Sequence, residues 1–233
     1  TWFNFSGRAF NSTQELLIFL LFLPRDVKKV LIVSGINNLV LSYMSRETSP
    51  VYNSFFAQTV FEQGLKRGAA RGVRGSLRLV ADELIHKFST GNGASATSTP
   101  EEKYPNILRC FKRDMRLWTL LRESMGFELF FAFQPIASWM EKSLSPEERE
   151  LFGILDEIDS TDGWQGIREF LNDWKGPYLE QVQEICRELQ VPFFDLNQCA
   201  SFLKSQWIFV DRAHLTDAGH RLCADTLTKE FAL

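Results

Sequence analysis

The chain has 233 residues, with 26 Lys and Arg against 29 Asp and Glu, and so carries a formal net charge of −3 at pH 7. This length can bury a sizeable core as one α/β domain or two small ones. The acidic balance argues against a protein built mainly to bind nucleic acid, so we expect no nucleic-acid partner.

Cysteine spacing and hydropathy exclude further classes of protein. No two cysteines form a Cys-x-x-Cys pair, so we expect neither a metal site nor a disulfide framework, but buried free thiols at Cys110, Cys186, Cys199 and Cys223. The longest apolar run, residues 16–23, is too short to span a bilayer, and no signal peptide is visible. These features favour a cytoplasmic location unless a targeting signal precedes Thr1.

The first part of the chain is predicted to alternate strands and helices. Residues 2–5, Trp-Phe-Asn-Phe, are mostly apolar and predict a short buried strand, which a polar turn follows. Residues 11–15 carry capping side chains ahead of an apolar run, so a helix should start there and end by Pro24. Residues 27–33 are rich in β-branched side chains and predict a second strand.

The second predicted strand ends in a polar segment, Ser34-Gly35-Ile36-Asn37-Asn38. Gly35 permits a sharp turn there, and the two amides project from the carboxyl end of the strand. This order of strand, polar turn and helix is typical of a parallel α/β sheet.

A helical insertion is expected at about residues 40–105. It contains a basic, Gly-rich piece, with Lys66, Arg67, Arg71, Arg74 and Arg78, and then a Ser- and Thr-rich loop at 89–100. Because aromatic residues do not interleave with these charges, we interpret the basic piece as a solvated helix face rather than a phosphate or nucleic-acid patch.

The second half of the chain continues the alternation. We expect a long helix at about 101–125, a strand at 128–133, helices at 146–158, 164–174 and 177–189, and a strand at 191–195. The helix from Pro146 begins with the capping box of Ser145 and Glu148. Tyr178, Val182, Ile185 and Leu189 share one helix face and are predicted to belong to the core. The total is four strands with helical crossovers.

The segment Asp211-Arg212-Ala213-His214 follows an apolar run and precedes an amphipathic stretch, residues 221–231. We expect Thr216 to cap that last helix. A histidine that acts as a general base needs an acceptor on its other ring nitrogen, and Asp211 is placed to provide one. In an open parallel sheet the ligand site lies beyond the carboxyl ends of the strands, where this pair and Asn37 are both predicted to be.

With these motifs in this order, the chain resembles the SGNH (GDSL-like) hydrolases over nearly its whole length. Asp211-Arg212-Ala213-His214 looks like the family's last motif, and Gly35-Ile36-Asn37-Asn38 looks like its Gly-x-Asn-Asp motif, with Asn38 where the family usually has Asp. The resemblance implies a three-layer, flavodoxin-like α/β fold with a parallel sheet and flanking helices. It also implies a general base at His214, an orienting carboxylate at Asp211 and an oxyanion donor at Asn37.

Two further family motifs match less closely. The family's second backbone oxyanion donor maps to Ala9, with Gly7 as the alternative. No Gly-x-Ser motif follows an apolar strand, so the nucleophile is unknown. Gly75-Ser76 lies in the insertion and Ser6 lies in the turn of the second motif. We therefore expect a single SGNH-like domain, residues 1–233, that is incomplete at its N-terminus.

Two classes of function remain open. In the first, the parent protein is a serine ester hydrolase acting on a small acyl ester or an O-acylated sugar, without a cofactor or metal. In the second, the chain is a non-catalytic relative or a binding module for a glycan or acyl ligand. Upstream sequence encoding an apolar strand followed by Gly-x-Ser would distinguish the two classes. Oligomeric state is not predicted.

Overall fold

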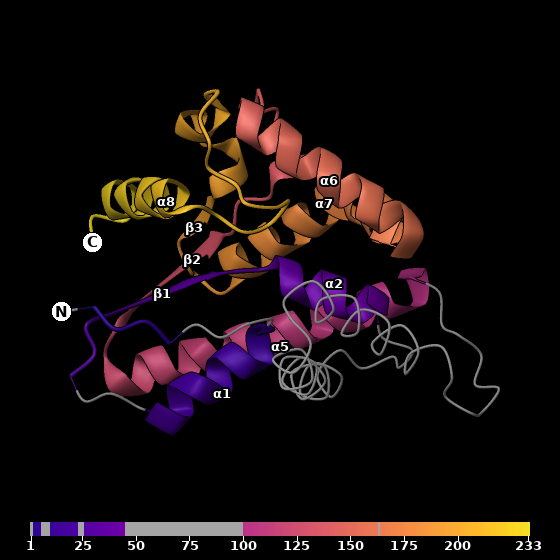
Figure 1. The fold of residues 1–233 in the computed structure, drawn as a ribbon. Coiled ribbons are helices and arrows are strands. Elements are labelled where there is room, and N and C mark those ends of the chain that lie inside the picture. Colours follow the sequence, from indigo (N-terminus) through magenta and orange to yellow (C-terminus); the bar gives the residue numbers. More distant parts are fainter. Residues whose placement is uncertain (1, 6–9, 23–25, 45–99, 163) are drawn as a thin grey trace, which may run out of the picture. The chain divides into compact units, whose positions relative to one another are not determined.

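The protein has a mixed α/β fold, seen in a computed structural model that describes residues 2–5, 10–22, 26–44, 100–162 and 164–233 (Figure 1). Most of the predicted insertion, with its basic piece and its Ser- and Thr-rich loop, lies outside these residues. The helices are α1 (Ser12–Phe22), α2 (Ile36–Met44), α5 (Pro100–Met125), α6 (Pro146–Asp162), α7 (Trp164–Glu188) and α8 (Asp217–Glu230). The strands are β1 (Lys29–Ser34), β2 (Glu128–Phe133) and β3 (Phe193–Asp195), and short 3-10 turns lie at Ala137–Trp139, Leu196–Gln198 and Ala200–Leu203.

The chain divides into two compact units. The first comprises Thr1–Leu23 and Ile36–Asp114, and the second comprises Pro24–Gly35 and Met115–Leu233. The first unit therefore contains α1, α2 and the beginning of α5. The second contains the sheet, the remainder of α5, and helices α6 to α8.

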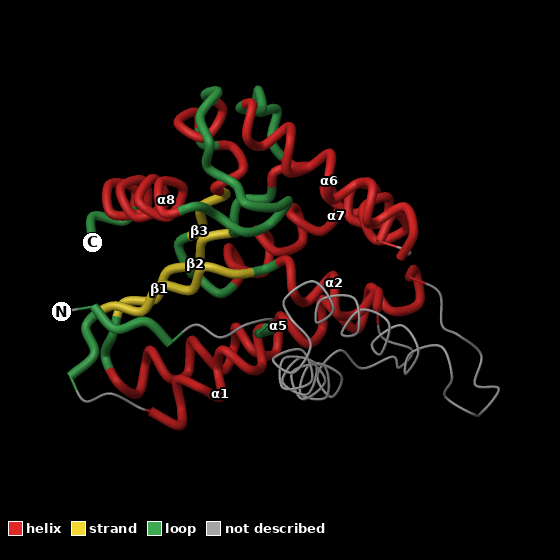
Figure 2. The backbone as a smooth tube through the Cα atoms, in the orientation of Figure 1, coloured by secondary structure: helices red, strands yellow, loops and turns green. Residues whose placement is uncertain are grey.

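The sheet of the second unit has three parallel strands in the order β1-β2-β3, drawn in yellow in Figure 2. β1 pairs with β2 from Lys29↔Glu128 to Ser34↔Phe133, and β2 pairs with β3 from Phe131↔Phe193 to Phe133↔Asp195. β2 is the central strand, and its sequence, ELFFAF, is almost continuously apolar, as expected of a strand covered on both faces. The predicted parallel α/β sheet is confirmed in this reduced form.

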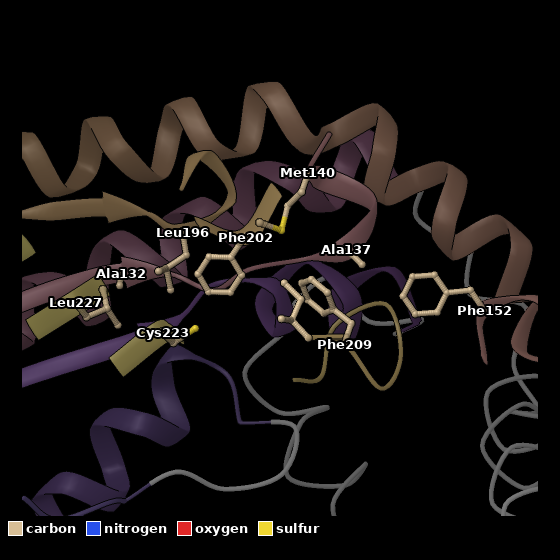
Figure 3. Close-up of a cluster of buried hydrophobic side chains, with 10 residues drawn as sticks. Ala132, Ala137, Met140, Phe152, Leu196, Phe202, Phe209, Cys223 and Leu227 are labelled. Atoms are coloured by element: carbon tan, nitrogen blue, oxygen red, sulfur yellow. The ribbon is translucent and has the colours of Figure 1, made fainter. Parts of the chain in front are cut away.

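Alternate side chains of β2 contact different helices, because successive residues of a strand point to opposite faces. Phe133 meets Tyr178 of α7 with ring centroids 6.0 Å apart, whereas Phe130 meets Phe231, just beyond α8, at 4.9 Å. Ala132 belongs to a buried cluster that extends to Phe152 of α6 (Figure 3); its other members are Ala137, Met140, Leu196, Phe202, Ile208, Phe209, Cys223 and Leu227.

The predicted strand at residues 2–5 is wrong. These residues form no strand, and the side chains of Trp2 and Phe3 are 64% and 71% exposed. A mostly apolar tetrapeptide becomes a strand only where a neighbouring strand satisfies its backbone groups, and such pairing is not encoded locally. The described residues therefore contain three strands, not four.

Helix α7 is longer than predicted, since residues 164–174 and 177–189 belong to one helix, Trp164–Glu188, with Pro177 inside it. Proline inside a helix costs roughly 3 kcal/mol through a lost hydrogen bond and a steric clash. The face that follows is nevertheless buried: Tyr178 and Val182 are fully inaccessible and Ile185 is 5% exposed. Burial of these side chains offsets the local cost.

Candidate active site

Asp211 and His214 lie at the tip of a tight antiparallel turn that precedes α8. Phe209 and Leu215 form an isolated antiparallel bridge. The Val210 N–H donates to the carbonyl of His214, and the Thr216 N–H donates to the carbonyl of Ile208, both at 2.9 Å. We call residues 207–216 the hairpin. It fixes the backbone on both sides of the two side chains.

The carboxylate of Asp211 holds both the backbone and the ring of His214. Its Oδ2 lies 2.7 Å from Nδ1 of His214, while Oδ1 accepts the N–H groups of Ala213 and His214 at 2.8 and 2.7 Å. An ionised carboxylate can only accept hydrogen bonds, so Nδ1 carries the proton. In the neutral ring Nε2 is then the basic nitrogen.

Asp211 is ionised at neutral pH. Partial burial raises the pKa of its carboxyl group, but hydrogen bonds from the His214 ring and from the N–H groups of Ala213 and His214 outweigh that effect and leave the pKa below its ordinary value. The side chain of His214 is 76% exposed and that of Asp211 is 37% exposed. Asp211 thus holds the Nδ1 side of the imidazole, while most of the His214 side chain is accessible to solvent.

Helix α8 starts as predicted. Thr216 is its N-cap, and the Thr216 hydroxyl accepts the Gly219 N–H at 3.1 Å. Gly219 lies so close to the hairpin that a Cβ atom there would be 2.4 Å from the carbonyl oxygen of Ile208 and 3.0 Å from the Leu215 side chain. The requirement for glycine at 219 was not predicted, because it arises from a contact between the helix and the hairpin.

Asn37 lies in the first turn of α2, in the first unit, rather than in a loop. Its Nδ2 donates to the carbonyl of Phe10 at 2.8 Å. Phe10 directly follows Ala9, which, with Gly7, lies outside the described residues. The amide predicted to be an oxyanion donor is therefore bonded to the backbone of Phe10.

Asn38 takes part in a buried network that the sequence did not reveal. It accepts the Ser12 N–H through Oδ1 at 2.9 Å and donates from Nδ2 to the Ser12 hydroxyl, also at 2.9 Å. Ser12 and Thr13 both donate their hydroxyls to Asp114 at 2.7 Å, and Arg113 pairs with the same carboxylate at 2.6 Å. Asp114, with its side chain 1% exposed, joins the start of α1 to α5.

Within the described ranges, no three His, Cys, Asp or Glu side chains are grouped as a metal site would require, and no helix is long and apolar enough to cross a membrane. All four cysteines are free, and burial raises the pKa of Cys186 and Cys223 to about 12. His220 is exposed on α8, and His86 lies outside the described residues.

Neither a protein-family model nor a curated protein matches this chain. Candidate functions therefore rest on the residues themselves.

Proposed function

We propose that the protein is a serine ester hydrolase of the SGNH type. The observation that carries this proposal is the Asp211–His214 pair, in which one carboxylate fixes both the ring and the backbone of an exposed histidine. A surface ion pair would need only the ring contact. The parallel sheet, with β2 side chains contacting α7 and a residue just beyond α8, supports the finer proposal of a three-layer, flavodoxin-like fold.

Each residue has a defined role in the proposed reaction. His214 Nε2 takes the proton of a serine hydroxyl as its oxygen attacks the ester carbonyl, and Asp211 stabilises the resulting imidazolium. The amide of Asn37 and the N–H of Ala9 donate to the oxyanion. The imidazolium then protonates the departing alkoxide, and a water molecule repeats the sequence to release the acid and regenerate the serine.

The proposed substrate is a small acyl ester or an O-acylated sugar. The nucleophilic serine is proposed to lie in a Gly-x-Ser segment encoded upstream of Thr1, since no Gly-x-Ser in this chain follows an apolar strand. The same observation favours the second candidate function, a non-catalytic binding module for an acyl or glycan ligand. The two candidates differ in whether the protein reacts with a serine-directed probe.

A fluorophosphonate probe and p-nitrophenyl acetate test the proposal on two proteins: the 233-residue chain and the product of the full reading frame. We expect the longer protein to be labelled and active, and His214→Ala to lower turnover by about 100-fold or more. His220→Ala is the matched control and should leave turnover unchanged.

The 233-residue chain should show neither labelling nor turnover. Stoichiometric labelling of a serine in it would place the nucleophile within this sequence and contradict the upstream location. A folded full-length protein that is neither labelled nor active would reject the hydrolase and favour the binding module.

A further inference from the structure

Helix α6 contacts the hairpin at successive turns. Glu148, Phe152 and Asp156 follow one another at intervals of four residues, so they share one face of the helix. Each of the three contacts residues 206–212 or the cluster beneath them, and Figure 3 shows Phe152 with Ala137 and Phe209 in that cluster. All these contacts lie within the second unit.

Glu148 binds the hairpin more extensively than a helix cap requires. Its Oε2 accepts the Ser145 N–H at 2.9 Å, as in any capping box. Its Oε1 accepts the N–H groups of Ile208 and Phe209, both at 3.0 Å. In a regular strand, successive residues point in opposite directions. Because the N–H groups of Ile208 and Phe209 instead converge on one carboxylate oxygen, Glu148 fixes the backbone conformation just before Asp211.

A buried lysine completes this contact. Lys142 pairs with Oε2 of Glu148, and both side chains are fully inaccessible. Lys142 Nζ also donates to the carbonyl of Gln206 at 2.9 Å. Burying two charges is unfavourable unless their geometry and hydrogen bonding are good. This pair meets that condition by binding the backbone of Gln206, just before the hairpin, and of Ile208 and Phe209 within it.

The other side of Asp211 is held through Arg212. Its guanidinium pairs with Asp156 at 2.6 Å, and its Cζ lies 5.0 Å from the ring centroid of Phe152. The carbonyl of Arg212 accepts the Ala137 N–H at 2.9 Å. The chain is therefore fixed at residues 206, 208 and 209 before Asp211 and at residue 212 after it.

We propose that Lys142, Glu148 and Asp156 are positioning residues that hold the Asp211–His214 pair in its proton-accepting geometry. The inference rests on the proposed function, because it assigns these residues a role in orienting the proposed base. They act through the hairpin and not on a substrate. Loss of the Glu148 charge removes its pairing with Lys142 and weakens the acceptor for two hairpin N–H groups. His214 then loses its fixed orientation toward Asp211.

The ring tautomer of His214, measured by ¹⁵N NMR on the ¹⁵N-histidine-labelled 233-residue chain, tests the inference. We expect the wild type to carry its neutral-ring proton on Nδ1. Glu148→Gln should lower the Nδ1–H fraction and raise the Nε2–H fraction, and Asp156→Asn should shift it in the same direction by less. Glu150→Gln, an exposed change on the same helix, is the matched control and should have no effect.

Amide spectra of α8 and urea unfolding establish whether each variant is folded. A folded Glu148→Gln protein with an unchanged tautomer would overturn the inference. If Glu148→Gln does not fold, an unchanged tautomer in Asp156→Asn overturns it. A wild-type protein without the Nδ1–H state would instead reject the Asp211–His214 assignment, and with it the proposed function.

Discussion

Replacing Gly35 with alanine should destabilise the second unit through two separable effects. Gly35 connects β1 to α2 and has φ of +131°, a conformation that residues with a side chain rarely adopt. A Cβ atom at this position would lie 2.4, 2.8 and 2.9 Å from three carbons of the Phe133 ring. Real Cβ atoms do not approach other carbons so closely, and Phe133 itself is fully buried.

The expected loss of unfolding free energy follows from these two effects. Backbone strain of this kind costs about 1–3 kcal/mol, and forcing extra volume into a packed core costs about 1–3 kcal/mol. Gly35→Ala should therefore lower the free energy of unfolding by about 2–6 kcal/mol. Domains are typically stable by about 5–15 kcal/mol, so the loss should be easily measured.

Urea unfolding followed by tryptophan fluorescence suits this measurement, since Trp118 and Trp139 of the second unit are buried. Gly153→Ala, where a new Cβ would meet no atom within 4 Å, is the control. It should stabilise helix α6 by about 0.5–1 kcal/mol. In a double-mutant cycle, Phe133→Leu should recover the steric part of the Gly35→Ala cost but not the strain. A loss below about 1 kcal/mol, with an unchanged denaturant slope, would refute the reasoning.

Three further changes test other parts of the structure by urea unfolding. Tyr178→Phe removes the hydroxyl that donates to the carbonyl of Gly35 at 2.9 Å, and should cost about 1–3 kcal/mol; a neutral result would mean that water replaces the contact. Asn38→Asp replaces the amide donor with a second carboxylate near Asp114, and should also cost about 1–3 kcal/mol; equal stability would show that the network tolerates a lost donor. Burial raises the pKa of Glu148, but its hydrogen bonds outweigh this and leave the pKa lowered. Its stabilising effect should thus be complete above about pH 4.3, the ordinary value, and be lost as pH falls through the folded-state pKa. Glu148→Gln should abolish that part of the pH dependence, and identical pH profiles would contradict this.

Elements with strong local signals were predictable from the sequence. The helix start at Asn11 is a capping pair in which Asn11 and Gln14 exchange side-chain to backbone hydrogen bonds at 3.1 and 3.0 Å. Thr216 caps α8, and the Ser145–Glu148 box opens α6. Each signal involves residues at most three positions apart, so the physical cause is contained in a short segment.

Elements that depend on distant partners were not predictable in the same way. Whether residues 2–5 pair with another strand depends on chain remote from them, so their apolar character alone gave the wrong result. Pro177 predicted a break in α7, but the buried face carrying Tyr178 and Val182 keeps the helix continuous. In both places tertiary packing decides against the local preference.

The candidate site shows the same division. The Asp211–His214 contact spans three residues and was anticipated from their spacing. The contacts from Glu148 to Ile208 and Phe209 span 60 and 61 residues, and nothing near Ser145 in the sequence distinguishes this capping glutamate from an ordinary one. Lys142, a few residues upstream of Ser145, pairs with Glu148, but only the structure shows that this lysine is buried.

Asn38 stands where the Gly-x-Asn-Asp motif usually has aspartate, and this difference has a physical reason in this chain. The Ser12 hydroxyl has one proton, and it goes to Asp114 at 2.7 Å. The hydroxyl oxygen then needs a donor, and the Asn38 amide supplies one at 2.9 Å while its own oxygen accepts the Ser12 N–H. An aspartate at 38 could accept that N–H but could not donate to the hydroxyl. The amide at 38 and the carboxylate at 114 are therefore complementary. The departure changes the network behind Asn37 and leaves the Asn37 side chain bonded to Phe10.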